Sequence, residues 1–278
     1  MRLVLIAVLV MGLAGAAQAQ PADASAFRQA RLDKLLAALS SDNARQLARQ
    51  QIKEMGKVAE PRLLSELDRR DDYVRVQVIL LLNEMGVRKA VPKYLAMLPE
   101  ALCRQQVWKR QFEEYNDKKQ KLDTAAKDVH RGGAAPSPSD YALVETLKKG
   151  LPRLFLTGGA QSPADVEVML LAQGIANMGD EGILGALATM LLESRKDATV
   201  HGGQWATAWG PVWDAFDNLL GGTNDPETIR KSIATLRQEA DPLQKKGPAR
   251  SAAEASFVAR FEVADLLADA RLDKLLYQ

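Results

Sequence analysis

The sequence predicts an all-α fold, and three observations support this class. Leu32, Leu35, Leu36 and Leu39 recur at the spacing of one apolar helix face. Strand signals are sparse, because aromatic residues make up 5% of the chain and β-branched residues rarely alternate with polar ones. A unit of two helices, whose first helix ends at Met-Gly, recurs along the chain. We therefore expect helices throughout and no β-hairpin.

Each recurring unit consists of an apolar helix, a tight turn after Met-Gly and a second amphipathic helix. A glycine suits the end of the first helix, because helix C-termini often need a residue in the left-handed conformation. In the first two units a proline, Pro61 or Pro92, lies near the start of the second helix, where a missing N–H costs little. The three stops are Met55-Gly56, Met85-Gly86 and Met178-Gly179.

Residues 44–98 resemble HEAT repeats, in particular the short HEAT-like repeats of phycobilisome lyase-related proteins. Tyr73-Val74-Arg75, after the acidic turn Asp71-Asp72, matches the Val-Arg that commonly opens a helix in that pattern. A weaker copy at 165–193 lacks the proline and the Val-Arg, and residues 99–160 interrupt the array. The resemblance implies stacked antiparallel helix pairs that form an irregular HEAT-like α-solenoid, with a binding surface rather than a reaction.

The interruption also sets the expected domain organisation. We expect an N-terminal helical HEAT-like region at 20–130, a flexible loop rich in Gly, Pro and Ser at 131–139, and a C-terminal helical region at 140–278. The first region ends in a charged helix from Trp108 to Asp128. This helix is either a solvated helix docked by a thin apolar stripe or a partner-binding arm. The stripe consists of Trp108, Phe112, Tyr115 and Leu122.

Local signals place further helices in the C-terminal region. A helix is expected over Asp140–Leu147. Ser162–Asp165 and Thr223–Glu227 each combine a capping residue, a proline and an acid, which is typical of a helix start. Lys245–Pro248 predicts a loop before a last long helix over Ala249–Ala268.

One heptapeptide occurs twice, near opposite ends of the chain. Ala30–Leu36 is repeated identically as Ala270–Leu276. Either both stretches have converged on one favourable amphipathic turn, or both ends dock as caps in similar grooves.

Residues 1–19 are typical of a cleavable secretory signal peptide. Arg2 precedes a short apolar run, and Ala17-Gln18-Ala19 forms an A-x-A cleavage site. The run is shorter than the about 20 residues that a membrane-spanning helix needs. We expect export to the periplasm with cleavage after Ala19, and membrane contact only through the signal peptide; an uncleaved anchor is the alternative.

Composition and motifs narrow the possible chemistry. Lys+Arg 37 against Asp+Glu 35 leaves no basic excess for a phosphate backbone, so we expect no nucleic-acid partner. The two histidines, His130 and His201, lack the spacing of a metal site, and the single Cys103 cannot form an internal disulfide. Cys103 follows Leu102 and is expected to be buried. We expect neither a cofactor nor a metal, and the lack of a catalytic motif favours a non-enzymatic role.

Segment 201–216 is the most distinctive local feature. Its three tryptophans fall at i, i+4 and i+8, so they would share one face of a continuous helix. On the surface they would form an aromatic platform for a sugar or a partner protein, and in the interior they would be packing between helices. The candidate binding residues are His201, Gln204, Trp205, Trp209, Trp213 and Asp214.

Two functions remain open at this point. The first is an exported helical-repeat scaffold that mediates protein–protein interaction in the bacterial cell envelope without catalysis. The second is an envelope protein that binds or cleaves glycan or peptidoglycan through segment 201–216. The sequence does not identify the protein partner of the first.

Cell fractionation with N-terminal sequencing tests the export. Because signal peptidase cleaves after an A-x-A site, the mature chain is expected in the periplasm and should begin at Gln20. A periplasmic chain that begins at Met1 would contradict the predicted cleavage.

Overall fold

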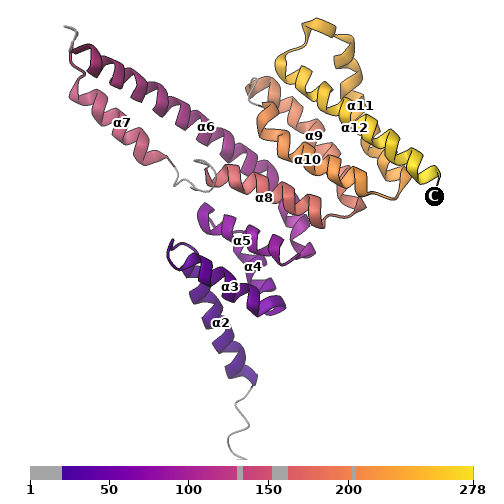
Figure 1. The fold of residues 1–278 in the computed structure, drawn as a ribbon, viewed down its shortest axis with the longest axis horizontal. Helices are drawn as coiled ribbons and strands as arrows, with labels where there is room; N and C mark the ends of the chain where they lie inside the picture. The colour runs from indigo at the N-terminus through magenta and orange to yellow at the C-terminus, as the bar shows by residue number, and fades with distance from the viewer. Residues whose placement is uncertain (1–20, 130–133, 152–161, 202–204, 278) are drawn as a thin grey trace, which may run out of the picture. The chain divides into compact units, whose positions relative to one another are not determined.

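The computed structural model describes residues 21–129, 134–151, 162–201 and 205–277 (Figure 1). Within these residues every regular element is a helix and no β-strand occurs, which confirms the predicted all-α class. The chain divides into two compact units, Met1–Arg69 and Arg70–Gln278. Across the described ranges, no helix combines the length and the apolarity needed to cross a membrane.

The first unit contains short helices that pack through their leucines. Leu32 and Leu36, which belong to the first copy of the repeated heptapeptide, are buried, as is Leu39. On the polar side of this copy, Arg62 Nε donates to Asp33 at 3.0 Å. The first copy is therefore docked within its unit. The elements are α2 (Pro21–Ala38), α3 (Arg45–Met55), η1 (Gly56–Val58) and α4 (Glu60–Glu66).

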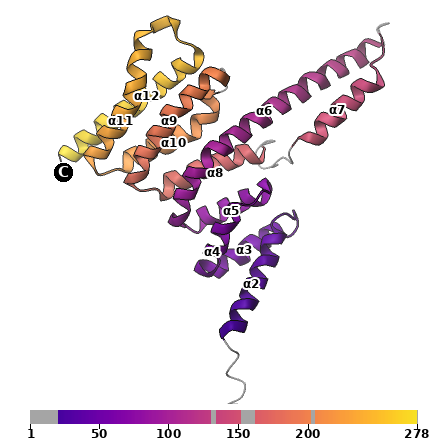
Figure 2. The same cartoon turned by 180° about the vertical axis from the view of Figure 1, so that it is seen from behind.

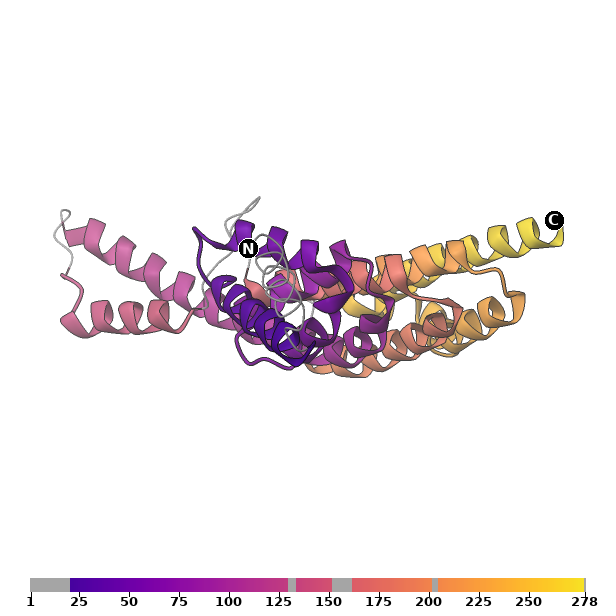
Figure 3. The ribbon, with the colours of Figure 1, turned by 90° about the horizontal axis from the view of Figure 1, so that it is seen from below.

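The second unit holds the two longest of the described helices, α6 and α12. α8 packs on α5, α6 and α10, and α9 to α12 pack on one another (Figure 1 and Figure 2). α6 and α7 lie side by side (Figure 3). The elements are α5 (Asp72–Glu84), η2 (Arg88–Ala90), α6 (Val91–Asp128), α7 (Pro138–Gly150), α8 (Pro163–Met178), α9 (Glu181–His201), α10 (Trp205–Gly222), α11 (Pro226–Lys245), η5 (Gly247–Ala249) and α12 (Ala252–Leu276).

α8 lies close to α5 and α6 at Gly174. A Cβ atom at this position would lie 2.5 Å from Asn83 Oδ1 and 2.6 Å from Tyr94 Cε2, so a larger residue would push the helices apart. Beside this contact, the Asn83 side chain donates to the carbonyl of Leu170 at 2.8 Å. The buried Tyr94 hydroxyl donates to the carbonyl of Ile79 at 3.3 Å. The glycine thus lets α8 lie at the centre of the unit.

The predicted helix starts are present and have the expected caps. The backbone N–H of Asp165 donates to Ser162 Oγ at 3.0 Å, and that of Ser162 donates back to the Asp165 carboxylate at 3.2 Å, which forms a capping box. At α11 the Asp225 carboxylate accepts from two backbone N–H groups. α12 begins three residues later than predicted, because Gly247–Ala249 forms the turn η5 and Ser251 is the cap.

The glycines of the three Met-Gly stops have two different backbone conformations. Gly56 and Gly86 have φ of 57° and 66°, the left-handed conformation that the sequence predicts. Gly179 instead has φ −64° and ψ 155°. A glycine is still needed there, since a Cβ atom would lie 2.5 Å from the carbonyl oxygen of Ile175.

The helices around the predicted loop differ from expectation. The amphipathic helix after Gly86 and the charged helix are one helix, α6, which continues through Pro99. The predicted loop at 131–139 lies within the second compact unit, Arg70–Gln278. The physical reason is that α6 and α7, on the two sides of that loop, pack on each other.

A buried carboxylate joins α5, α6 and α8. Glu167 on α8 is fully buried and accepts from Arg75 Nε at 2.7 Å and from Arg75 Nη2 at 3.0 Å. Arg104 Nη2 on α6 donates to both of its oxygens at 2.9 Å. We call these three residues the Glu167 clamp. Burial alone would lower the pKa of Arg75, but the hydrogen bonds and charges of Glu167 and Asp72 raise it, so the guanidinium stays charged.

Removing the clamp carboxylate should be strongly destabilising. Glu167→Ala would leave the buried Arg75 without its main counter-charge, so we expect the free energy of unfolding to fall by about 3–5 kcal/mol in urea titrations followed by circular dichroism. The matched control is Glu100→Ala, because Glu100 also pairs with Arg104, at 2.6 Å, but its side chain is 78% exposed. That variant should lose less than about 1 kcal/mol. Equal losses in the two variants would contradict the assigned role of the clamp.

Candidate partner-binding groove

The second half of α6, Trp108 to Asp128, forms an arm with α7. At the base of the arm, Arg104 of the clamp holds α6 to α8, and the Gln105 side chain donates to Asp165 at 2.7 Å. Beyond this base, α6 packs along α7. Every residue of α7 is described, and Val144 is its single buried residue. The arm is therefore anchored at one end and thinly packed along its length.

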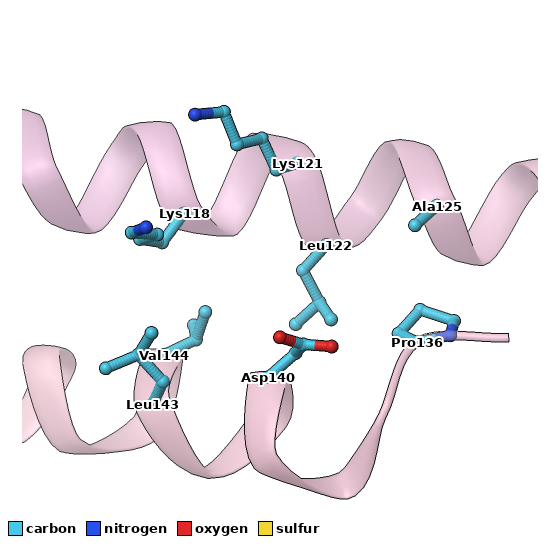
Figure 4. A pocket seen from close by; sticks show the side chains of 8 residues that line it. All are labelled: Lys118, Lys121, Leu122, Ala125, Pro136, Asp140, Leu143 and Val144. Carbon is cyan, nitrogen blue, oxygen red and sulfur yellow. The ribbon is translucent and has the colours of Figure 1, made fainter.

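An open groove lies between the two helices of the arm (Figure 4). Its volume is about 260 Å³. Leu122 points from α6 toward α7, whereas the Lys121 ammonium points away from α7. We call this hollow the α6–α7 groove. Apolar side chains and three charged ones line it: Lys118, Lys121, Leu122, Ala125, Pro136, Asp140, Leu143 and Val144.

Asp140 has a structural task at the edge of the groove. Its backbone N–H donates to Ser137 Oγ at 3.3 Å, and the Ser137 N–H donates to its carboxylate at 2.9 Å, so the pair caps the start of α7. The Ser137 hydroxyl also donates to the Asp140 carboxylate at 2.7 Å. This hydrogen bond, the one from the Ser137 N–H and then the charge of Lys118 lower the pKa of Asp140. The carboxylate is therefore ionised at neutral pH and holds the first turn of α7.

The α6–α7 groove has the chemistry of a side-chain pocket. Its volume is below the about 300–1,000 Å³ that is typical of small-molecule sites. The lysines at its rim add positive charge beside the apolar lining. Lys121 pairs with Asp117 at 2.8 Å in an exposed i,i+4 pair, which a partner's carboxylate can replace at small cost. The groove thus suits an apolar side chain that is followed or preceded by an acidic one.

A second hollow of about 260 Å³ lies at the base of the arm, between α6 and the start of α8. Trp108 is part of its wall and stacks on Phe112, with ring centroids 5.2 Å apart. Cys103 also lines it and is exposed, so the expectation of a buried cysteine is wrong. The reason is the register of α6: Ala101 and Leu102 take the core positions of this turn, and Cys103 falls on the side of the hollow.

Two of the candidate tryptophans lie in the interior. Trp209 and Trp213 are buried, together with Phe216, on the face of α10 that packs against its neighbours. The Trp213 ring meets Phe216 and Phe257 edge to face, with centroids 6.1 and 5.6 Å away. For these two residues the structure corresponds to the packing alternative, so neither ring offers a platform to a ligand.

Of the other candidate residues of segment 201–216, the structure describes the side chain of Asp214. Asp214 is exposed and accepts from Arg260 Nη1 of α12 at 3.0 Å. His201 is the last residue of α9 and Trp205 the first of α10, and their side chains lie outside the described residues. Gln204 also lies outside the described residues.

Most residues that form the groove have no distinctive pattern in the sequence. Leu122 belongs to the apolar stripe of the charged helix, whereas Leu143 and Val144 belong to a short helix with no distinctive motif. The alternation of apolar and charged residues on the charged helix could have indicated that a second helix covers only part of it. Within the described part of the chain, no group of three or more His, Cys, Asp or Glu side chains is placed to hold a metal ion.

Comparison of the chain with family models, with curated proteins and with solved structures gives no match. Function therefore has to be argued from the site itself.

Asp217, near Asp214 on α10, should make stability depend on pH. Burial raises the pKa of Asp217 to about 6, the charge of Arg260 acts against this, and Asp214 adds to it. Since the folded-state pKa lies above the unfolded value of about 4, the folded state binds the proton more tightly. The free energy of unfolding should rise as pH falls from about 6 to about 4.

Asp217→Asn removes this proton-binding step. It should raise the free energy of unfolding at pH 7 by at most about 3 kcal/mol and flatten the pH dependence between about pH 4 and 6. The exposed Asp214→Asn is the control. It removes only the small contribution of the Asp214 charge to the raised pKa of Asp217, so most of that dependence should remain. Parallel stability–pH curves for wild type and Asp217→Asn would refute the assignment.

Proposed function

We propose that this chain is an exported, non-catalytic helical scaffold of the bacterial cell envelope that binds a partner protein through the α6–α7 groove. The observation that carries the proposal is the arm itself. It is fixed at its base by part-buried hydrogen bonds from Arg104 and Gln105 to carboxylates, and between its two helices it exposes a groove with a largely apolar lining. A rigid anchor with an open apolar groove is typical of surfaces that take up a helix or side chain of another protein.

The packing of α7 supports a binding role. A helix of 13 residues that buries one side chain gains little from its own core. Tyr141 and Leu143, both on α7, are 49% and 43% exposed, which places large apolar surface beside the groove. A partner that covers these side chains would stabilise α7 as it binds.

The remaining parts of the proposal come from the sequence. The signal-peptide pattern of residues 1–19 supports export, and the Met-Gly units support a HEAT-like repeat origin for the helix pairs. We infer an irregular α-solenoid built from such pairs. Such a scaffold needs no metal or cofactor. A glycan-binding role has less support, because Trp209 and Trp213 belong to the core.

A photo-cross-linking experiment identifies the partner and tests the groove. A photoreactive residue in place of Tyr141 should capture a periplasmic protein, and binding of that protein to purified chain can then be measured by calorimetry. Leu143→Glu, which puts a carboxylate into the apolar lining, should weaken binding about tenfold or more. The matched control is Met169→Glu on α8, since Met169 is 44% exposed and lies outside the groove.

Both variants should melt within about 2 °C of wild type, because both side chains are already exposed. Equal binding by the two variants would exclude the groove as the binding site. Capture of cell-wall fragments instead of protein would favour the glycan-binding function.

A further inference from the structure

Among the described helices, α12 carries the most exposed large apolar side chains, and three of them form a strip on its outer face. Val263, Leu266 and Leu267 are 47%, 71% and 40% exposed. The opposite face of the helix is in the core, where Phe257 and Phe261 are buried. α12 packs on α10 and α11 through that inner face. The terminal helix of a stacked array normally has a polar outer face, so this strip needs a cover.

Two residues of the strip, Val263 and Leu266, belong to a heptad pattern that runs along α12. Its residues are separated by alternating steps of four and three, which is the spacing of a two-helix seam. All of them are exposed except Ser256, which is partly exposed. We call these residues the α12 seam: Ala252, Ser256, Ala259, Val263, Leu266, Ala270 and Asp273.

We propose that the α12 seam pairs with the α12 seam of a second copy of this chain, antiparallel and about a twofold axis. In this register Val263 lies opposite the second copy's Leu266, and Ala259 lies opposite the second copy's Ala270. Ser256 lies opposite the second copy's Asp273, so that the hydroxyl can donate to the carboxylate. The twofold axis repeats each of these pairs, as expected for a surface that is complementary to itself.

The charges favour this orientation over a parallel one. In a parallel pair each seam residue would face its own copy, which would place Asp273 against the second copy's Asp273 in the seam. The antiparallel pair removes that contact. It brings Glu262 near the second copy's Asp269, but these carboxylates flank the seam, remain in water and are screened. The repulsion avoided inside the seam is therefore larger than the repulsion accepted at its edge.

The shape of the seam also fits a second α12. Ala252, Ala259 and Ala270 are small, which allows two helices to approach closely on both sides of the Val263 and Leu266 layers. α12 has 25 residues and is therefore about 38 Å long. A single pair of helices of this length buries an area at the low end for specific complexes, so the dimer should depend on concentration.

An anionic surface is a poor alternative cover for this face. Glu262, Asp269 and Asp273 lie on or beside the seam and would be repelled by a negatively charged membrane. Pairing with a second copy does not bring these carboxylates against a negatively charged surface. Asp273 meets the second copy's Ser256, and Glu262 and Asp269 stay in water.

Sedimentation velocity on the purified chain tests the pairing. The mass should rise from that of one chain to twice that mass as protein concentration increases. Leu266→Glu should weaken the dimer about tenfold or more, because it puts two carboxylates at the centre of the seam. Leu47→Glu on α3 is the matched control, since Leu47 is 60% exposed and lies in the other unit, and it should dimerise as wild type does.

A cross-linking experiment tests the orientation. In a Cys103→Ser background, chains with Ala259→Cys mixed with chains with Ala270→Cys should be joined by a short thiol cross-linker, whereas chains with Ala259→Cys alone should not. Cross-linking of Ala259→Cys chains with one another would overturn the antiparallel register. A wild-type chain that stays monomeric at all concentrations, or a dimer that Leu266→Glu leaves intact, would overturn the pairing itself. None of these outcomes depends on the α6–α7 groove.

Discussion

The carboxylate of Glu167 on α8 receives four hydrogen bonds from Arg75 of α5 and Arg104 of α6. Bringing these charges out of water is costly, and only a complete set of hydrogen bonds offsets the cost. The geometry must therefore be satisfied by all three helices at once. Close packing at Gly174 on the same helix adds a steric constraint on the position of α8 against α5 and α6. Together they determine where α6 leaves the core of the second unit.

The properties of the arm follow from that position. α6 is rigid at its base, where Gln105 and Arg104 are bonded to α8, and it then runs on as a helix with charged surfaces and few core residues. α7 covers part of it through Val144 and is capped by Ser137 and Asp140. A surface that is held at one end and incompletely packed at the other is suited to binding, because a partner could supply the packing that the arm lacks.

Local features of the sequence predicted local structure well. Ser162 and Asp225 cap helices because their signals involve residues within one turn, and Gly56 and Gly86 end helices for the same reason. The clamp could not be predicted, because Arg75 and Glu167 are distant in sequence and each looks like an ordinary surface charge. The helical spacing predicts that Trp209 and Trp213 share one face of a helix. Spacing alone does not tell whether that face lies in the core, and in the structure both tryptophans are buried.

The repeated heptapeptide shows the limit of local sequence most directly. In the first copy Leu32 and Leu36 are buried, and Asp33 pairs with Arg62. In the second copy Leu276 is 73% exposed, while Arg271 donates to the carbonyl of Thr223 at 2.8 Å. Identical residues thus have different surroundings because one copy has a helix packed on its leucines and the other lies at the end of α12. Burial is therefore set by what packs against a segment, and the residues of the segment do not determine it alone.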